Sequence, residues 1–162
     1  MIKIILISLF ATLVIVAGIY IYVVPIDKIV MFYGDKLRGN LFAGFLTLGG
    51  FLFSLKTFIV IKMKENVYDH AEYKRNLDEK KRLNPNLTLY GPLQRLSNLL
   101  FFSVLFSIIT AVLQLSLGLV ENWHAVLVCL ATAIFTLIIL VISLFLIKSN
   151  LDQWFGFLEN NE

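Results

Sequence analysis

The fourth apolar segment of the chain, from Ala125 to Ile147, reads AVLVCLATAIFTLIILVISLFLI. It holds 23 residues and no charged side chain. As an α-helix it would be roughly 35 Å long, enough to cross a bilayer hydrocarbon core of about 30 Å. Its apolar residues are continuous, whereas the strands of a membrane barrel alternate apolar with polar residues. The segment therefore predicts a transmembrane helix.

Three similar segments precede it, at residues 4–24, 41–61 and 99–120, with Lys56 as their one charged residue. Lys56 lies five residues before the end of its segment, so its ammonium group can reach the headgroup region. The first segment is longer than the apolar part of a secretory signal, and no small-x-small cleavage site follows it, so we expect it to remain. The chain is predicted to be all-α, with residues 1–162 forming one membrane domain of four transmembrane helices.

The composition supports this class. Hydrophobic residues make up 59% of the 162 residues and charged residues 15%, against roughly 45–50% and about 25% in soluble domains. These values exclude a water-soluble globular domain, and they exclude disorder, which requires low hydrophobicity and high charge. A single cysteine excludes an internal disulfide, and two histidines leave little material for a structural zinc site.

The basic residues predict the orientation. With the N-terminus inside, ten of the fourteen Lys and Arg residues lie in the inner segments, three lie in the outer connections and Lys56 lies within a span. Because cytoplasmic loops carry the excess of Lys and Arg, both termini are predicted to be cytoplasmic. The outer connections would then be residues 25–40 and the short link 121–124. Apolar residues at helical spacing make the first a short surface helix or a plain connector.

The inner connection, residues 62–98, is predicted to be a charged helical hairpin in the cytoplasm. Between Lys62 and Arg82 it has seven basic and five acidic residues, and no Gly or Pro precedes Pro85. The second transmembrane helix is therefore expected to continue for roughly 30 Å beyond the membrane. A helix that is polar nearly all round is either solvated or docked on a partner. Its candidate partner-binding residues are Lys74, Arg75, Lys80, Lys81 and Arg82.

The tail, residues 148–162, carries an apolar stripe at helical spacing formed by Leu151, Trp154, Phe155 and Leu158. It is predicted to be an amphipathic helix at the cytoplasmic membrane surface or a docking peptide. Trp154 and Phe155 are candidate partner-binding residues because large aromatic side chains often anchor interfaces.

Small and weakly polar residues recur every three or four positions within the spans. Helices in lipid associate through such residues, so these stripes predict a compact bundle and a homo-oligomer. The alternative is that some of them line a pore between subunits. The candidate packing or pore residues are Gly50, Ser107, Thr110, Gln114 and Gly118.

Little in the sequence indicates catalysis. No Asp, Glu or His lies within a span, so a proton relay or an intramembrane protease is not expected. Asp69, His70 and Glu72 offer metal-binding atoms, but neighbouring residues on a helix point apart. The chain has no phosphate-binding or dinucleotide-binding glycine motif. We expect no enzymatic activity, no cofactor or metal, and no direct binding of nucleic acid.

The layout of the whole chain resembles the four-span membrane subunit of the Kiwa anti-phage defence system. The segments from Lys62 to Arg95 and from Lys148 to Glu162 occupy the cytoplasmic positions of that layout. The resemblance implies a homo-oligomeric sensor or scaffold in the bacterial inner membrane, which holds a soluble, nucleic-acid-binding effector protein. Two other functions remain open. One is an oligomeric ion channel or membrane-depolarising abortive-infection protein, and the other is an immunity or superinfection-exclusion protein.

Overall fold

The computed structural model describes residues 2–22 and 26–159, apart from the side chains of residues 2, 22, 26, 27, 72 and 153–159. Every regular element within these ranges is a helix, and four helices are long and apolar enough to cross a membrane. They are α1 (Ile2–Tyr22), α3 (Arg38–Met63), α5 (Gly91–Leu115) and α6 (Trp123–Glu159). The predicted all-α class with four such helices is confirmed, and the side on which the termini lie stays a prediction.

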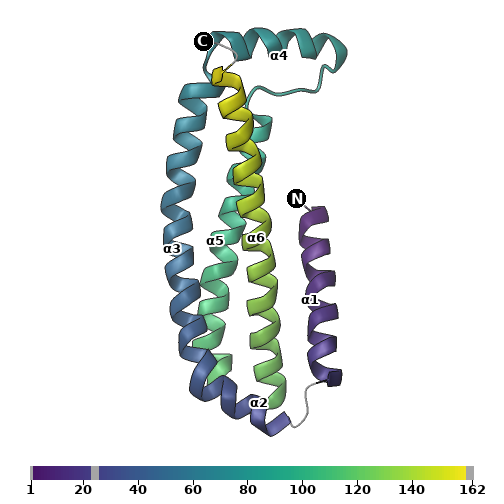
Figure 1. Cartoon of the computed structure of the whole chain (residues 1–162), viewed down its shortest axis with the longest axis vertical. Helices are drawn as coiled ribbons and strands as arrows, with labels where there is room; N and C mark the ends of the chain where they lie inside the picture. The colour runs from purple at the N-terminus through teal and green to yellow at the C-terminus, as the bar shows by residue number, and fades with distance from the viewer. Residues whose placement is uncertain (1, 23–25, 160–162) are drawn as a thin grey trace.

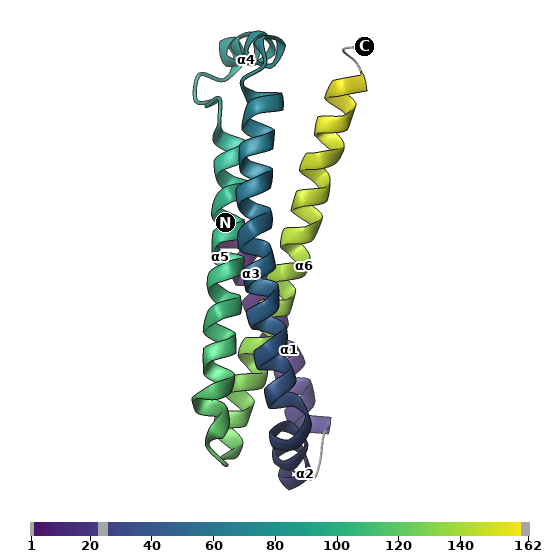
Figure 2. The ribbon, with the colours of Figure 1, turned by 90° about the vertical axis from the view of Figure 1, so that its left-hand side faces the viewer.

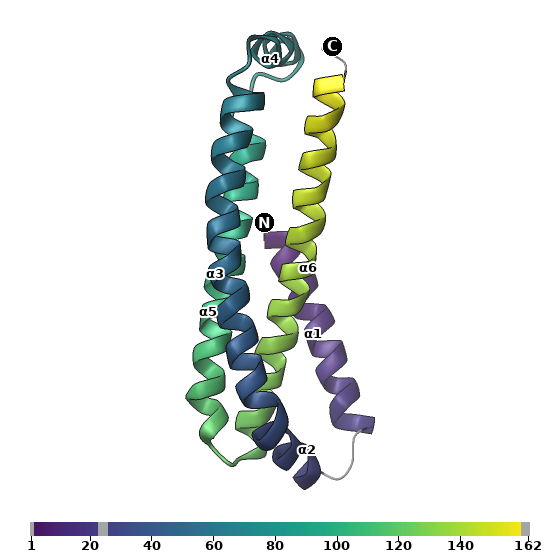
Figure 3. The same cartoon turned by 60° about the vertical axis from the view of Figure 1, so that its left-hand side comes forward.

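The four long helices form an elongated bundle (Figure 1). Helices α3 and α5 share the most extensive contact, and α6 packs against α5. Helix α1 packs chiefly against α6, and its N-terminal end lies well below the level reached by α3 and α6 (Figures 1 and 3). Towards that upper end, α6 diverges from α3 and α5 (Figure 2).

The core follows the line where α3, α5 and α6 meet. Its middle part consists of the buried residues Phe45, Leu52, Val104, Ala111, Ala133 and Leu140. Large apolar side chains also cover the outside of the bundle, where Phe10, Phe51 and Phe145 are 70%, 60% and 69% exposed. A soluble protein rarely exposes so much continuous apolar surface, whereas lipid tails would cover it at little cost.

The end of the bundle that is lower in Figure 1 is closed by short elements. Helix α2 (Ile26–Phe32) and a π-helical turn, η1 (Tyr33–Leu37), lead into α3. The helical interpretation of this connection is therefore confirmed. A 3-10 turn, η3 (Leu117–Leu119), and a short link join α5 to α6, where the Asn122 side chain accepts a hydrogen bond from the His124 N–H at 2.9 Å. This bond caps the start of α6, because the first N–H groups of a helix lack partners within it.

At the opposite end, the prediction of one continuous helix beyond the second span was wrong. Helix α3 ends at Met63 and is followed by a π-helical turn, η2 (Lys64–Tyr68). The backbone becomes extended at His70, with ψ of 138°, and α4 (Ala71–Leu83) then runs across the end of the bundle (Figure 1). The turn buries Val67 and Tyr68 in a cluster with residues of α5 and α6. A straight helix leaving the bundle would expose both side chains.

The predicted tail helix is a continuation of α6, so it is not a separate element. Helix α6 has 37 residues, which corresponds to roughly 55 Å. The segment from Lys148 to Glu159 therefore continues upward in line with the transmembrane part (Figure 3).

Candidate docking site at the α4 end of the bundle

Helix α4 presents most of its polar side chains to solvent. Among the predicted partner-binding residues, Lys74, Arg75, Lys80 and Arg82 are exposed, and we call them the α4 surface. The fifth predicted residue, Lys81, is half-buried, with its Nζ 3.9 Å from the Asp78 Oδ1. Leu77 is only 8% exposed, so α4 has an inward face as well as an outward one.

The last turn of α4 carries a concentration of positive charge, because it contains Lys80, Lys81 and Arg82. Cations at this end of a helix interact favourably with the helix dipole, which accounts for part of the pattern. The side chains of Lys80 and Arg82 have no ion-pair partner within the described part of the chain. Their charge is therefore available to an acidic ligand.

The orientation of α4 is fixed by aromatic contacts. The ring of Tyr68, in η2, meets the ring of Tyr73, in α4, edge-on at 4.9 Å between centroids. The ring of Tyr90, just before α5, lies 6.2 Å from that of Tyr68. Aromatic pairs of this geometry stabilise a structure by about 0.5–1.5 kcal/mol beyond the burial of their area. The three rings therefore hold α4 against the end of α3 on one side and the start of α5 on the other.

A hydrogen bond strengthens the same junction. The Tyr90 hydroxyl donates to the Asp69 Oδ1 at 2.6 Å, and the Lys64 Nζ lies 3.7 Å from the Asp69 Oδ2. This hydrogen bond, with the nearby positive charges, holds the pKa of Asp69 below its usual range, and the same bond raises the pKa of Tyr90. Asp69 stands where the chain turns from η2 into α4, so the bond fixes the direction of that turn.

Trp154 and Phe155 belong to the upper part of α6, and their side chains lie outside the described residues. Their backbone positions and α4 are at the same end of the bundle (Figures 1 and 3).

The predicted packing or pore residues of α5 lie inside a single chain. Ser107 and Thr110 are buried, and the Thr110 Oγ1 is 2.7 Å from the Thr136 Oγ1 of α6. A second pair, Ser103 and Ser143, joins the same helices with 2.6 Å between the two Oγ atoms. These hydrogen bonds hold α5 against α6.

Gln114 is the centre of a buried network. Its Oε1 accepts a hydrogen bond from the Tyr33 hydroxyl at 2.6 Å, and its Nε2 donates to the Cys129 carbonyl at 3.0 Å. Because both ends of the amide have partners, burial of this polar side chain is not costly. The network joins η1, α5 and α6.

The two predicted glycines differ in their surroundings. A Cβ at Gly118 would clash with the Tyr33 hydroxyl and lie 3.4 Å from the Arg38 Cδ, and the Gly118 carbonyl accepts from the Arg38 Nη1 at 3.4 Å. A Cβ at Gly50 would meet open space. Within the chain, the close approach of α3 to α5 is made by the neighbouring Gly49, where a Cβ would lie 3.3 Å from the Ser107 Cβ.

Sequence reasoning missed the roles of Tyr33, Arg38 and Gly49. Tyr33 is one of the residues at helical spacing in the connection 25–40, but its partner Gln114 is 81 residues away. No local pattern indicates a contact of that separation.

No group of three or more His, Cys, Asp or Glu side chains that could hold a metal ion occurs within residues 2–22 and 26–159 as described. Asp69, one of the residues that offer metal-binding atoms, has its carboxylate engaged by Tyr90 and Lys64.

No protein-family model matches the chain, and neither a curated protein nor a solved structure is detectably similar to it.

Proposed function

We propose that this protein is a non-enzymatic membrane scaffold or sensor that holds a soluble partner protein at the α4 surface. The observation that carries the proposal is the placement of α4, which lies across the end of the bundle with Lys74, Arg75, Lys80 and Arg82 exposed. The Tyr68 contacts and the Asp69 bond hold α4 in this orientation, so its exposed basic residues keep a fixed position relative to the bundle.

In the proposed orientation, α4 and the end of α6 are in the bacterial cytoplasm, as the excess of inner Lys and Arg indicates. The partner is then a cytoplasmic protein with an acidic surface. In the setting that the layout resemblance implies, it is the soluble effector of an anti-phage system. Charge on α4 speeds association, while Trp154 and Phe155 supply holding energy once the partner is bound.

We also propose that the chain assembles with copies of itself through the outward face of α3. Its small residues Ala43, Thr47, Gly50 and Ser54 are all exposed in the single chain. Small side chains let helices approach closely in lipid. Within the described part of the chain, a Cβ at Gly50 on this face would have no neighbouring atom within 4 Å.

A pore between subunits has less support. Thr110 and Gln114 are buried and hydrogen-bonded within one chain, and Ser107 is buried opposite Gly49. A residue that lined a pore between copies would instead face outward from the single chain.

The docking proposal is tested by charge reversal at two exposed positions of the α4 surface, Lys80→Glu with Arg82→Glu. The matched control is Lys28→Glu with Lys36→Glu, which makes the same change of charge on exposed residues at the opposite end of the bundle. Tagged protein is purified from cells that carry its neighbouring genes, and the association rate of the co-purified protein is measured at several salt concentrations.

We expect the α4 reversal to slow association and flatten its dependence on salt, because steering by charge is screened by ions. The control should bind like the wild type. If the wild type recovers no soluble partner, or if both double variants bind it equally well, the α4 surface is not the docking site.

A further inference from the structure

A pocket of about 490 Å³ opens between α5 and α6 below the level of α4. Its lining residues belong to the part of the bundle in which α6 diverges from α5, a divergence that Figure 2 shows. Pro92 and Arg95, from the first turns of α5, and Ser149 and Asn150, from α6, form one part of its wall. Its size is within the range of small-molecule sites, roughly 300–1,000 Å³.

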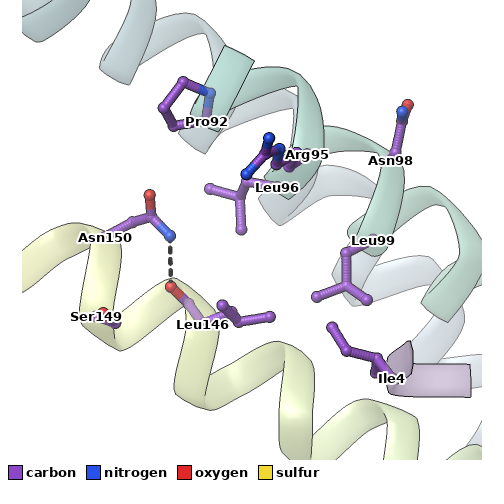
Figure 4. A pocket seen from close by; sticks show the side chains of 9 residues that line it. All are labelled: Ile4, Pro92, Arg95, Leu96, Asn98, Leu99, Leu146, Ser149 and Asn150. Atoms are coloured by element: carbon purple, nitrogen blue, oxygen red, sulfur yellow. Dashed lines mark hydrogen bonds between the residues drawn. The ribbon is translucent and has the colours of Figure 1, made fainter. Parts of the chain in front are cut away.

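The pocket is amphipathic. Leu99, Leu146 and Ile4, the last from the start of α1, lie on one side of it, while Arg95 and Asn150 lie towards the other side (Figure 4). Leu96 is beside Arg95, and the Asn150 Nδ2 donates a hydrogen bond to the Leu146 carbonyl at 2.7 Å (Figure 4). Asn98 also borders the pocket but points away from these residues (Figure 4). An occupant would therefore have an apolar part beside Ile4 and a polar part beside Arg95.

The polar end favours an anion. None of the nine residues that line the pocket is acidic, and Arg95 has no hydrogen bond or ion-pair partner within the described part of the chain. The N-terminus of α5 lies beside it, and the helix dipole adds a partial positive charge there, although Pro92 has no N–H and the N–H groups of Gly91 and Gln94 are bonded to the Thr88 and Tyr90 carbonyls. A guanidinium group binds phosphate with two parallel hydrogen bonds.

When the apolar part of α1 is placed across the hydrocarbon core, the pocket lies at the depth of lipid headgroups. The apolar stretch of α1 runs from Lys3 to Ile21, 19 residues, or roughly 28 Å as a helix, which matches the hydrocarbon thickness. Ile4 is at one end of this stretch. At the other end, Tyr20 and Trp123 pair with their ring centroids 6.4 Å apart, as expected of aromatic residues at a membrane interface.

We propose that this pocket binds one anionic phospholipid, with its phosphate on Arg95 and the start of an acyl chain against Leu99, Leu146 and Ile4. Basic pockets between transmembrane helices on the cytoplasmic side are suited to anionic headgroups. The proposal does not depend on the docking of a partner at α4. Free phosphate shares the headgroup chemistry but would make no use of the apolar end.

The test uses the full chain purified in detergent, with dioleoyl-phosphatidylglycerol and dioleoyl-phosphatidylcholine as probes that differ only in the headgroup. Retention of each lipid is measured by native mass spectrometry, and binding affinity by titration followed with thermal unfolding. Inorganic phosphate is titrated in parallel. We expect phosphatidylglycerol to bind more tightly than phosphatidylcholine and phosphate to bind far more weakly than either.

Arg95→Gln should reduce the affinity for phosphatidylglycerol by about tenfold, which is the low end for a hydrogen bond to a charged group. Lys36→Gln, the same change of charge at an exposed site on the opposite end, should leave the affinity unchanged. Ser149→Phe should fill the pocket without a change of charge and weaken the binding of both lipids.

Equal affinity of the wild type for the two lipids would overturn the proposal, even if Arg95→Gln failed to fold. Equal losses in Arg95→Gln and Lys36→Gln would also overturn it, because they would indicate attraction by net charge alone. Binding of inorganic phosphate as tight as that of phosphatidylglycerol would overturn it as well, since the ligand would then be a free anion.

Discussion

Adjacent glycines in α3 are predicted to respond in opposite ways to the same substitution. Gly49 faces α5, where a Cβ would lie 3.3 Å from the Ser107 Cβ and 3.6 Å from the Ile108 Cγ1. Gly50 faces away, and a Cβ there would have no neighbouring atom within 4 Å. Replacement by leucine therefore tests the packing of the most extensive helix contact in the bundle.

The magnitude follows from these distances. At Gly49, a Cβ alone requires Ser107 to move by a few tenths of an ångström, and leucine adds three further carbon atoms at this buried position. Overpacking of this kind costs about 1–3 kcal/mol, which for a chain of 162 residues lowers Tm by roughly 2–12 °C. At Gly50, the leucine side chain would extend into lipid or detergent, so the single chain should be as stable as the wild type.

The assay combines thermal unfolding in detergent with the mass of the protein–detergent complex. Gly49→Leu should lower Tm, whereas Gly50→Leu should leave the Tm of the monomer unchanged and reduce the mass if the outward face of α3 joins copies of the chain. An unchanged Tm for Gly49→Leu would refute the contact between α3 and α5. A lower Tm for monomeric Gly50→Leu would show that residue 50 of α3 faces another helix of the same chain and not the outside of the bundle.

Two further predictions concern the polar contacts. Gln114→Leu should destabilise the protein by about 1–3 kcal/mol, because it leaves the Tyr33 hydroxyl and the Cys129 carbonyl buried without their partner; adding Tyr33→Phe should recover part of the loss, and denaturant unfolding measures both. Tyr90→Phe should raise the pKa of Asp69, followed by NMR, towards its usual range, because it removes the hydrogen bond that holds this pKa low. Since a lowered carboxyl pKa stabilises the folded form above the ordinary carboxyl range and this contribution is lost in acid, the wild-type junction should loosen only at low pH.

The four long helices could be predicted because their signal is local. A run of about twenty apolar residues has one stable structure in a bilayer, whatever the rest of the chain does. For the short helix before α3 the local pattern indicates a helix, since Ile29, Val30 and Tyr33 recur at helical spacing, but it does not exclude a plain connector. Such patterns need no knowledge of which helices are neighbours.

The break before α4 could not be predicted in this way. Residues 62–82 contain strong helix formers and no Gly or Pro, so local preference favours one straight helix. The helix turns because Tyr68 is buried against Leu93 and Leu96, and because Tyr90 binds Asp69 from the far side of the hairpin. These contacts arise only after α3 and α5 are side by side.

The choice between neighbouring glycines was also beyond sequence reasoning. Successive residues on a helix differ by about 100° in direction, so Gly49 and Gly50 serve different faces. The spacing of small residues along α3 indicates a face suited to close packing, but it does not indicate which helix packs against that face. The rotation of α3 is set by partners in α5, and no pattern within α3 reports it.

The proposed lipid pocket is linked to the junction that orients α4 through residues at and just before the start of α5. Leu96 lines the pocket and belongs to the same buried cluster as Tyr68, whose ring contacts Tyr73 of α4. Pro92, also in the pocket wall, is two residues after Tyr90, which binds Asp69 at the turn into α4. An occupant that shifts the first turn of α5 would therefore change the contacts that orient α4. Because coupling between two binding sites is reciprocal, a protein bound to the α4 surface would alter the affinity of the pocket for lipid by the same factor. The two proposed sites would then be coupled, so that the anionic lipid content of the membrane would change the affinity of the α4 surface for its soluble partner.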